Sequence, residues 1–215
     1  MAYDVVIFDL DGTLLDTLDD LMDSCNYALS TIGAPPRTRA EIRRFVGNGI
    51  RNLMLQAVPD GEDNPKFEQA YETMQTWYKA HNQIKTAPYP GVQQLIRTLK
   101  QQGVPMAVVS NKPDASVQML VEQWFPEITF GLGEREGLRR KPERDMVDYA
   151  IAQLGQTGKK TVYVGDSEVD LTTAANAGLD CISVTWGFRD RALLVERGAK
   201  QFADTAEELL QLIQG

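Results

Sequence analysis

Residues 5–17 of the chain read VVIFDLDGTLLDT. The first four residues would be apolar on both faces of a strand, which is typical of a parallel sheet covered by helices on both sides. Two aspartates, Asp9 and Asp11, follow this run, and Gly12 provides a turn. Ligands of open α/β sheets bind beyond the carboxyl ends of strands, so this stretch predicts an α/β protein with a polar site after its first strand.

Similar apolar runs recur along the chain and alternate with amphipathic helical segments. This succession predicts a doubly wound, Rossmann-like parallel sheet. The strand candidates are Val5–Leu10, Pro105–Ser110, Thr161–Gly165 and Cys181–Thr185, with weaker ones at Ile128–Phe130 and Gln201–Phe202.

One long segment, residues 16–86, contains no good strand candidate. Apolar residues recur there at helical spacing, and the pattern predicts an all-helical insert. Residues 87–91 read APYPG, which is turn chemistry that stops a helix. We therefore predict a catalytic core made of residues 1–15 and 87–215, with a helical cap domain at 16–86.

Polar side chains follow the strands of the predicted core. Because parallel strands share one carboxyl edge, these side chains are expected to gather there. They are Asp9, Asp11 and Thr13 after the first strand, Ser110 and Asn111 after the second, and Asp166 after the strand at 161, with Lys141 between the last two groups.

Crowded carboxylates repel one another unless a cation neutralises them. Hard oxygen ligands without histidine or thiol select Mg²⁺. Asp9 and Asp166 can each supply a carboxylate oxygen, whereas Asp11 is expected to supply its backbone carbonyl. The sequence therefore predicts a Mg²⁺ cofactor.

A carboxylate beside a metal can act as a nucleophile, and Asp9 is the candidate. Asp11 would protonate the leaving oxygen and then deprotonate the water that breaks the aspartyl phosphate. Thr13, Ser110, Lys141 and the N–H groups of the turn after Asp9 could hold the transferring phosphoryl oxygens. This pattern predicts a phosphatase.

These residues occur in four motifs that resemble those of the haloacid dehalogenase-like hydrolase superfamily, in order and over nearly the whole chain. The resemblance implies hydrolysis of a small phosphate ester. It also implies that Asn111 lies at the phosphate with Ser110, and that Asp170 supports the metal site. The motifs are DLDGTLLDT at 9–17, Ser110-Asn111, Lys141-Pro142 and GDSEVD at 165–170.

Three shorter stretches resemble the phosphoglycolate-phosphatase-like branch of that superfamily: SNKP at 110–113, FVGNG at 45–49 and TWG at 185–187. They imply phosphoglycolate as the favoured substrate. One position departs from the pattern of this branch: Glu143-Arg144 follows Lys141-Pro142, where a second proline is often found.

The loop Gly47–Arg51 in the predicted cap has two interpretations. It is either a turn between two helices or a substrate loop whose helix N-terminus binds an anion. In the second case Arg43 or Arg51 would pair with a substrate carboxylate.

Composition and net charge limit the kinds of partner that the sequence predicts. The formal net charge of −8 argues against general nucleic-acid binding, and no stretch approaches the roughly 20 apolar residues of a membrane span. The start of the chain does not read as a signal peptide. Cys25 and Cys181 are expected to be core residues in a reducing compartment, which predicts a cytoplasmic protein. The sequence leaves the oligomeric state open.

Two other functions use similar chemistry. A phosphosugar mutase shares the aspartyl-phosphate step, but that branch tends to have an acidic residue at the position of Gly165. A non-enzymatic phospho-acceptor domain also uses an acidic pocket, Mg²⁺ and a lysine, but needs neither a cap nor an acid/base at Asp11.

Overall fold

The computed structural model describes residues 1–215, and the chain separates into two compact units. The core unit consists of Met1–Leu15 and Pro88–Gly215, and the helical unit is Asp16–Ala87. The chain passes between the units through two short strands, β2 (Leu15–Asp16) and β3 (Ala87–Pro88), which pair with each other. No helix is long and apolar enough to cross a membrane.

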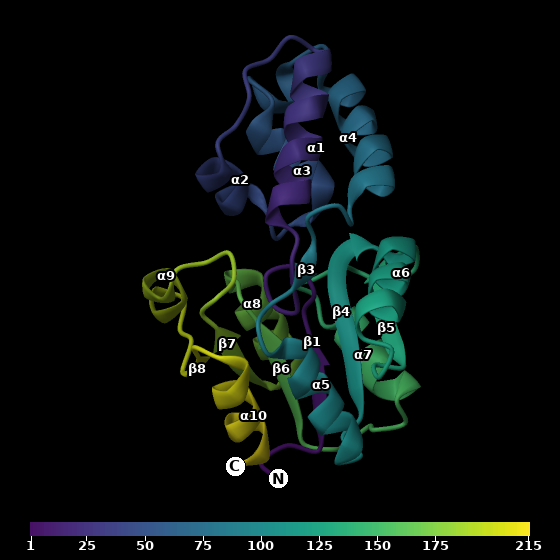
Figure 1. The fold of residues 1–215 in the computed structure, drawn as a ribbon, viewed down its shortest axis with the longest axis vertical. Coiled ribbons are helices and arrows are strands. Elements are labelled where there is room, and N and C mark those ends of the chain that lie inside the picture. The colour runs from purple at the N-terminus through teal and green to yellow at the C-terminus, as the bar shows by residue number, and fades with distance from the viewer. The chain divides into compact units, whose positions relative to one another are not determined.

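A six-stranded parallel sheet forms the centre of the core unit, in the order β5-β4-β1-β6-β7-β8 (Figure 1). The chain builds outward from β1 in both directions, so β1 lies at the topological switch point where such sheets bind ligands. The strands are β1 (Val5–Phe8), β4 (Met106–Pro113), β5 (Phe130–Glu134), β6 (Thr161–Gly165), β7 (Asp180–Val184) and β8 (Gln201–Ala203).

Both faces of the sheet are covered by helices. Along β1, Val6 and Phe8 pack into the cluster formed with α5, α6 and α10, and Val5 and Ile7 pack into the one formed with α7 and α8. The doubly wound α/β fold class is therefore confirmed. The helices of this unit are α5 (Val92–Gln101), α6 (Asp114–Trp124), α7 (Asp145–Gln153), α8 (Glu168–Ala177), α9 (Arg191–Glu196) and α10 (Ala206–Gln214).

Strand register positions the polar residues. Phe8, the last residue of β1, pairs with Val108 of β4 on one side and with Val164 of β6 on the other. Asp9 therefore emerges between the ends of these two neighbouring strands.

Three strand predictions differ from the structure by two residues or more. β1 was expected to run to Leu10 but ends at Phe8. β4 was expected to end at Ser110, but it continues to Pro113 with a register shift after Val109. β5 begins at Phe130, where the expected strand ended. The sequence pattern missed this strand because two of its five residues are glycines, which interrupt the apolar run. Helices α7 and α9 were not predicted.

The helical unit packs α1 against α4, and α3 packs against α4. At its entry and exit, the buried Asp20 carboxylate accepts hydrogen bonds from the backbone N–H groups of Lys85 and Thr86, at 3.0 and 2.9 Å. These hydrogen bonds join the two ends of the unit. Its helices are α1 (Leu18–Thr31), α2 (Arg39–Phe45), α3 (Gly49–Ala57), the 3₁₀ turn η1 (Gly61–Asp63) and α4 (Phe67–His81).

Candidate active site

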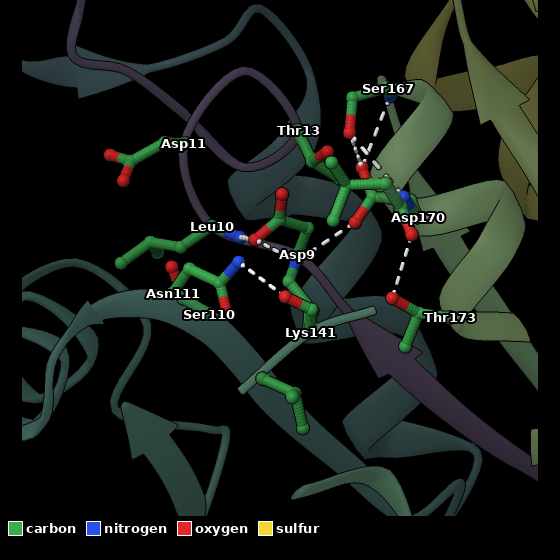
Figure 2. A network of polar contacts seen from close by, with 12 residues as sticks. Asp9, Leu10, Asp11, Thr13, Ser110, Asn111, Lys141, Ser167, Asp170 and Thr173 are labelled. Carbon is green, nitrogen blue, oxygen red and sulfur yellow. Dashed lines mark hydrogen bonds and ion pairs between the residues drawn. The ribbon is translucent and has the colours of Figure 1, made fainter. Parts of the chain in front are cut away.

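Asp9 lies directly after β1 with only 8% of its surface exposed. Its backbone N–H donates to the carbonyl of Val164, which ties the loop to β6. Its Oδ1 accepts the N–H of Leu10 at 2.7 Å and lies 2.9 Å from Lys141 Nζ (Figure 2). The carboxylate is therefore held in one orientation.

Lys141 is the cation at the centre of the site, and 2% of it is exposed. Besides Asp9, its Nζ contacts Asp170 Oδ1 at 2.8 Å and the hydroxyl of Tyr163 at 3.0 Å. Its backbone carbonyl accepts a hydrogen bond from Asn111 Nδ2 at 3.0 Å. The end of β4 thus fixes the segment that carries the ammonium.

Asp166 follows β6 and is buried, with the backbone of the loops that contain Gly12 and Gly187 close to its side chain. Its Oδ2 accepts the N–H of Phe188 at 2.6 Å, and its Oδ1 accepts the Thr13 hydroxyl at 3.3 Å. A Cβ at Gly12 or at Gly187 would overlap the Asp166 side chain, and Gly12 also has a φ of +83°. Glycine is needed at both positions so that the two loops can close around this carboxylate.

Asp170 lies in the first turn of α8 and is fully buried. It forms a capping box with Ser167, whose N–H and hydroxyl both donate to Asp170 Oδ2, while Oδ1 accepts from Lys141 and Tyr163. Both oxygens are therefore occupied, which suits a residue that orients Lys141 and the turn carrying Asp166.

The site carries an excess of negative charge. Ligand oxygens of Asp9, Asp166 and Asp170 lie within 4.8 Å of one another, and Lys141 is the ammonium among them. Burial raises the pKa of Asp9 well above its ordinary value, Asp170 adds to the effect, and Lys141 offsets it only in part. Burial, together with Asp170, raises the pKa of Asp166 to about 7.

The pKa of Lys141 moves in the other direction from what its burial alone would cause. Burial lowers the pKa of an ammonium, but the neighbouring Asp170 and Asp9 carboxylates outweigh it and raise the pKa well above its ordinary value. Lys141 is therefore charged, and the remaining negative charge suits a bound cation.

The Asp11 side chain does not join this cluster. It points away from Asp9 (Figure 2), and its Oδ2 lies 3.0 Å from the ammonium of Lys112. Ser110 Oγ accepts the N–H of Lys112 at 3.3 Å, at the same strand end. The structure thus brings the core residues expected from the sequence to one edge of the sheet, with Asp11 turned outward.

The arginines expected to contact substrate lie in the helical unit. Arg51 is 43% exposed in its side chain and pairs with Glu62 at 3.0 Å and Glu68 at 2.6 Å. Its guanidinium also lies over the rings of Phe67 and Tyr71. Arg43 is partly buried in α2. A role for either arginine in reading substrate stays a prediction.

Tyr163 and Phe188 were not predicted to be at the site, and Lys112 and Ser167 were quoted only as members of the strand-end motifs, without a role of their own. Ser167 had a readable signal, because serine three residues before an acidic residue at a helix start is a capping-box pattern. The others become visible only when distant strands are placed side by side.

A family model for haloacid dehalogenase-like hydrolases matches residues 6–184. The chain belongs to this family. As in other hydrolases, the expected chemistry is bond cleavage by water, and the match spans both the core motifs and the helical insert.

Among the relatives of this haloacid dehalogenase-like hydrolase are proteins named phosphoglycolate phosphatase. That of Pseudomonas putida is 33% identical over 194 residues, which cover 86% of this chain and 70% of the relative. That of Agrobacterium fabrum is 32% identical over 198 residues, or 86% and 82% of the two chains. These relatives support phosphatase activity in this family member.

A crystal structure from Lactobacillus delbrueckii subsp. bulgaricus has the same fold, with a TM-score of 0.94 and 39% identity over 99% of both chains. That protein is itself named a phosphoglycolate phosphatase only provisionally. The likeness supports the architecture and the family assignment.

Proposed function

We propose that this protein is a Mg²⁺-dependent phosphatase that hydrolyses a small phosphorylated metabolite through a phosphorylated Asp9. The observation that carries the proposal is the buried Asp9 carboxylate, held by Lys141 at 2.9 Å in a cluster with Asp166 and Asp170. Such a group can attack phosphorus once its charge is offset.

The residues of the cluster fit Mg²⁺. Asp9 and Asp166 offer hard carboxylate oxygens, and the backbone carbonyl of Asp11 is a further candidate ligand. Asp170 would support the site from behind, since both of its oxygens are already hydrogen-bonded. Bound Mg²⁺ would supply the positive charge that lets a phosphate dianion approach Asp9.

In the first step, an Asp9 oxygen forms a bond to phosphorus while the ester P–O bond breaks. Asp11 donates a proton to the departing oxygen, so the leaving group departs as an alcohol. In the second step, water attacks the phosphorus of the aspartyl phosphate and gives its proton to Asp11, which releases inorganic phosphate and restores Asp9. Lys141, Thr13 and Ser110 are proposed to hold the phosphoryl oxygens.

Phosphoglycolate is the favoured substrate within this proposal. Its support is the name of relatives that are 32–33% identical and cover most of the chain. Arg43 and Arg51 remain proposed contacts for its carboxylate. Because Arg51 already pairs with Glu62 and Glu68, a substrate would have to compete with both glutamates.

The test is a phosphate-release assay across a panel of phosphorylated metabolites, with Mg²⁺ and then with EDTA. Steady release of inorganic phosphate is expected with Mg²⁺, greatest for phosphoglycolate, and none after chelation. Release that persists after dialysis against EDTA would rule out the metal assignment. Conversion of a sugar phosphate to its isomer without free phosphate would instead identify a mutase.

We expect Mg²⁺ to stabilise the fold as well as to support turnover. A ligand at 100 times its Kd adds about 2.7 kcal/mol, which corresponds to a rise in Tm of about 5–10 °C for a chain of this size. Asp166→Asn should abolish most of this rise, because it removes a carboxylate ligand. Thermal unfolding with and without Mg²⁺ measures the effect.

The matched control is Asp148→Asn, which removes an exposed carboxylate that pairs with Arg144 in the same unit. This variant should keep the full Mg²⁺-dependent rise. An equal rise in wild type and Asp166→Asn would show that Asp166 does not bind the metal.

A further inference from the structure

Lys112 is a buried ammonium that the mechanism above does not use. Only 3% of its side chain is exposed, and its Nζ lies 3.0 Å from Asp11 Oδ2. A charge taken out of water is costly unless an opposite charge faces it. Lys112 therefore needs an anion at this position, and in this structure Asp11 provides one.

The backbone of Lys112 is fixed by its surroundings. Its N–H donates to Ser110 Oγ, and a Cβ at Gly133 would overlap its carbonyl oxygen, so β5 approaches β4 closely here. The neighbouring Asp114 carboxylate accepts the N–H of Gly133 at 2.7 Å. The strand end that presents Ser110 thus also determines where the Lys112 side chain begins.

Asp11 is only partly satisfied by this pair. Its Oδ2 faces Lys112, but its Oδ1 is buried and accepts no hydrogen bond. Its carboxylate points away from Asp9, where phosphorus would be attacked (Figure 2). To reach the leaving oxygen, the Asp11 side chain has to turn away from Lys112. The buried ammonium of Lys112 would then face the position that the Asp11 carboxylate occupied.

We propose that Lys112 then pairs with a negatively charged group on the leaving part of the substrate. Asp11 serves the ester oxygen, so a cation within contact distance of Asp11 lies on the leaving-group side of the site. An anion a few atoms from that oxygen would replace Asp11 as the partner of Lys112. The substrate class is a phosphate monoester with a carboxylate close to its ester oxygen, and the inference rests on the proposed phosphatase function.

The test compares two substrates that differ in one group. 2-Phosphoglycolate and 2-hydroxyethyl phosphate have the same two-carbon chain, but the second has a hydroxymethyl group in place of the carboxylate. Losing one partner of a buried charge pair reduces affinity strongly, so Lys112→Met should lower the ratio of the two kcat/KM values by about 10²-fold. Lys112→Arg, which keeps the charge, should restore part of the ratio.

Lys112→Gln is the second neutral variant, since its polar end can still donate to Asp11 if methionine disturbs the fold. Lys100→Met is the matched control, because Lys100 is an exposed lysine on α5 of the same unit, and this variant should keep the wild-type ratio. A ratio within about threefold of wild type in a folded neutral Lys112 variant would overturn the proposal. A wild-type protein that releases phosphate from no monoester would overturn the phosphatase function itself.

Discussion

Asp9→Asn is expected to lower phosphate release from any substrate by at least about 10⁴-fold, as removal of a catalytic nucleophile does in other enzymes. An amide is a poor nucleophile and a weak ligand for Mg²⁺. The fold should survive, because Lys141 keeps Asp170 as a partner at 2.8 Å. Steady-state phosphate release with Mg²⁺ measures the loss.

Stability separates a catalytic Asp9 from a structural one. Because the pKa of Asp9 is raised in the folded protein, its ionised form costs stability at neutral pH. Replacing it with a neutral amide should therefore leave the Tm of the metal-free protein unchanged or higher. A folded Asp9→Asn protein with wild-type turnover would disprove the mechanism, and a large fall in Tm would indicate a structural role.

Lys141→Met is expected to reduce both activity and stability. It removes the ammonium that pairs with the buried Asp9 and Asp170 carboxylates, and breaking a buried ion pair costs about 3–5 kcal/mol because the opposite charge is left uncompensated. It also removes a group that would hold the phosphoryl oxygens, which costs about 10²–10³-fold in kcat. Urea unfolding and phosphate release measure the two losses.

Mg²⁺ should reduce the difference in the free energy of unfolding between wild type and Lys141→Met, because the bound cation would neutralise the carboxylates that Lys141 neutralises. The control is again Lys100→Met, which removes an exposed ammonium and should change the free energy of unfolding by less than about 0.5 kcal/mol. A Lys141→Met protein as stable as wild type without metal would contradict the ion pairs of Lys141 with Asp9 and Asp170.

Much of the core was readable from local pattern. The run Val5–Phe8 is apolar at every position because helices cover the strand on both faces, so its burial could be predicted from these four residues alone. The helical segment was readable for the same reason, since the stretch predicted to be all-helical forms α1, α2, α3 and α4. Where glycine or a short helix weakens the pattern, as in β5 and α9, local reasoning failed.

The sequence predicted where these side chains lie better than it predicted which groups they contact. The amide of Asn111 donates to the carbonyl of Lys141, a contact that the sequence did not predict, while its contact with the phosphate stays a prediction. Arg51 pairs with two glutamates of its own unit, Glu62 and Glu68, which the sequence did not predict, while its contact with substrate stays a prediction. A polar residue type indicates what a group can bond to, and the neighbours decide which bond forms.

The sequence by itself determined the class of chemistry. Asp9, Asp11, Lys141 and Asp166 follow or separate buried strands, and parallel strands share one carboxyl edge, so their meeting at one edge of the sheet follows from chain order. Tertiary structure alone decided which charges touch. The pairing of Lys112 with Asp11 and of Asp166 with the N–H of Phe188 depends on strand register and loop approach between segments far apart in the chain, and no local pattern encodes that distance.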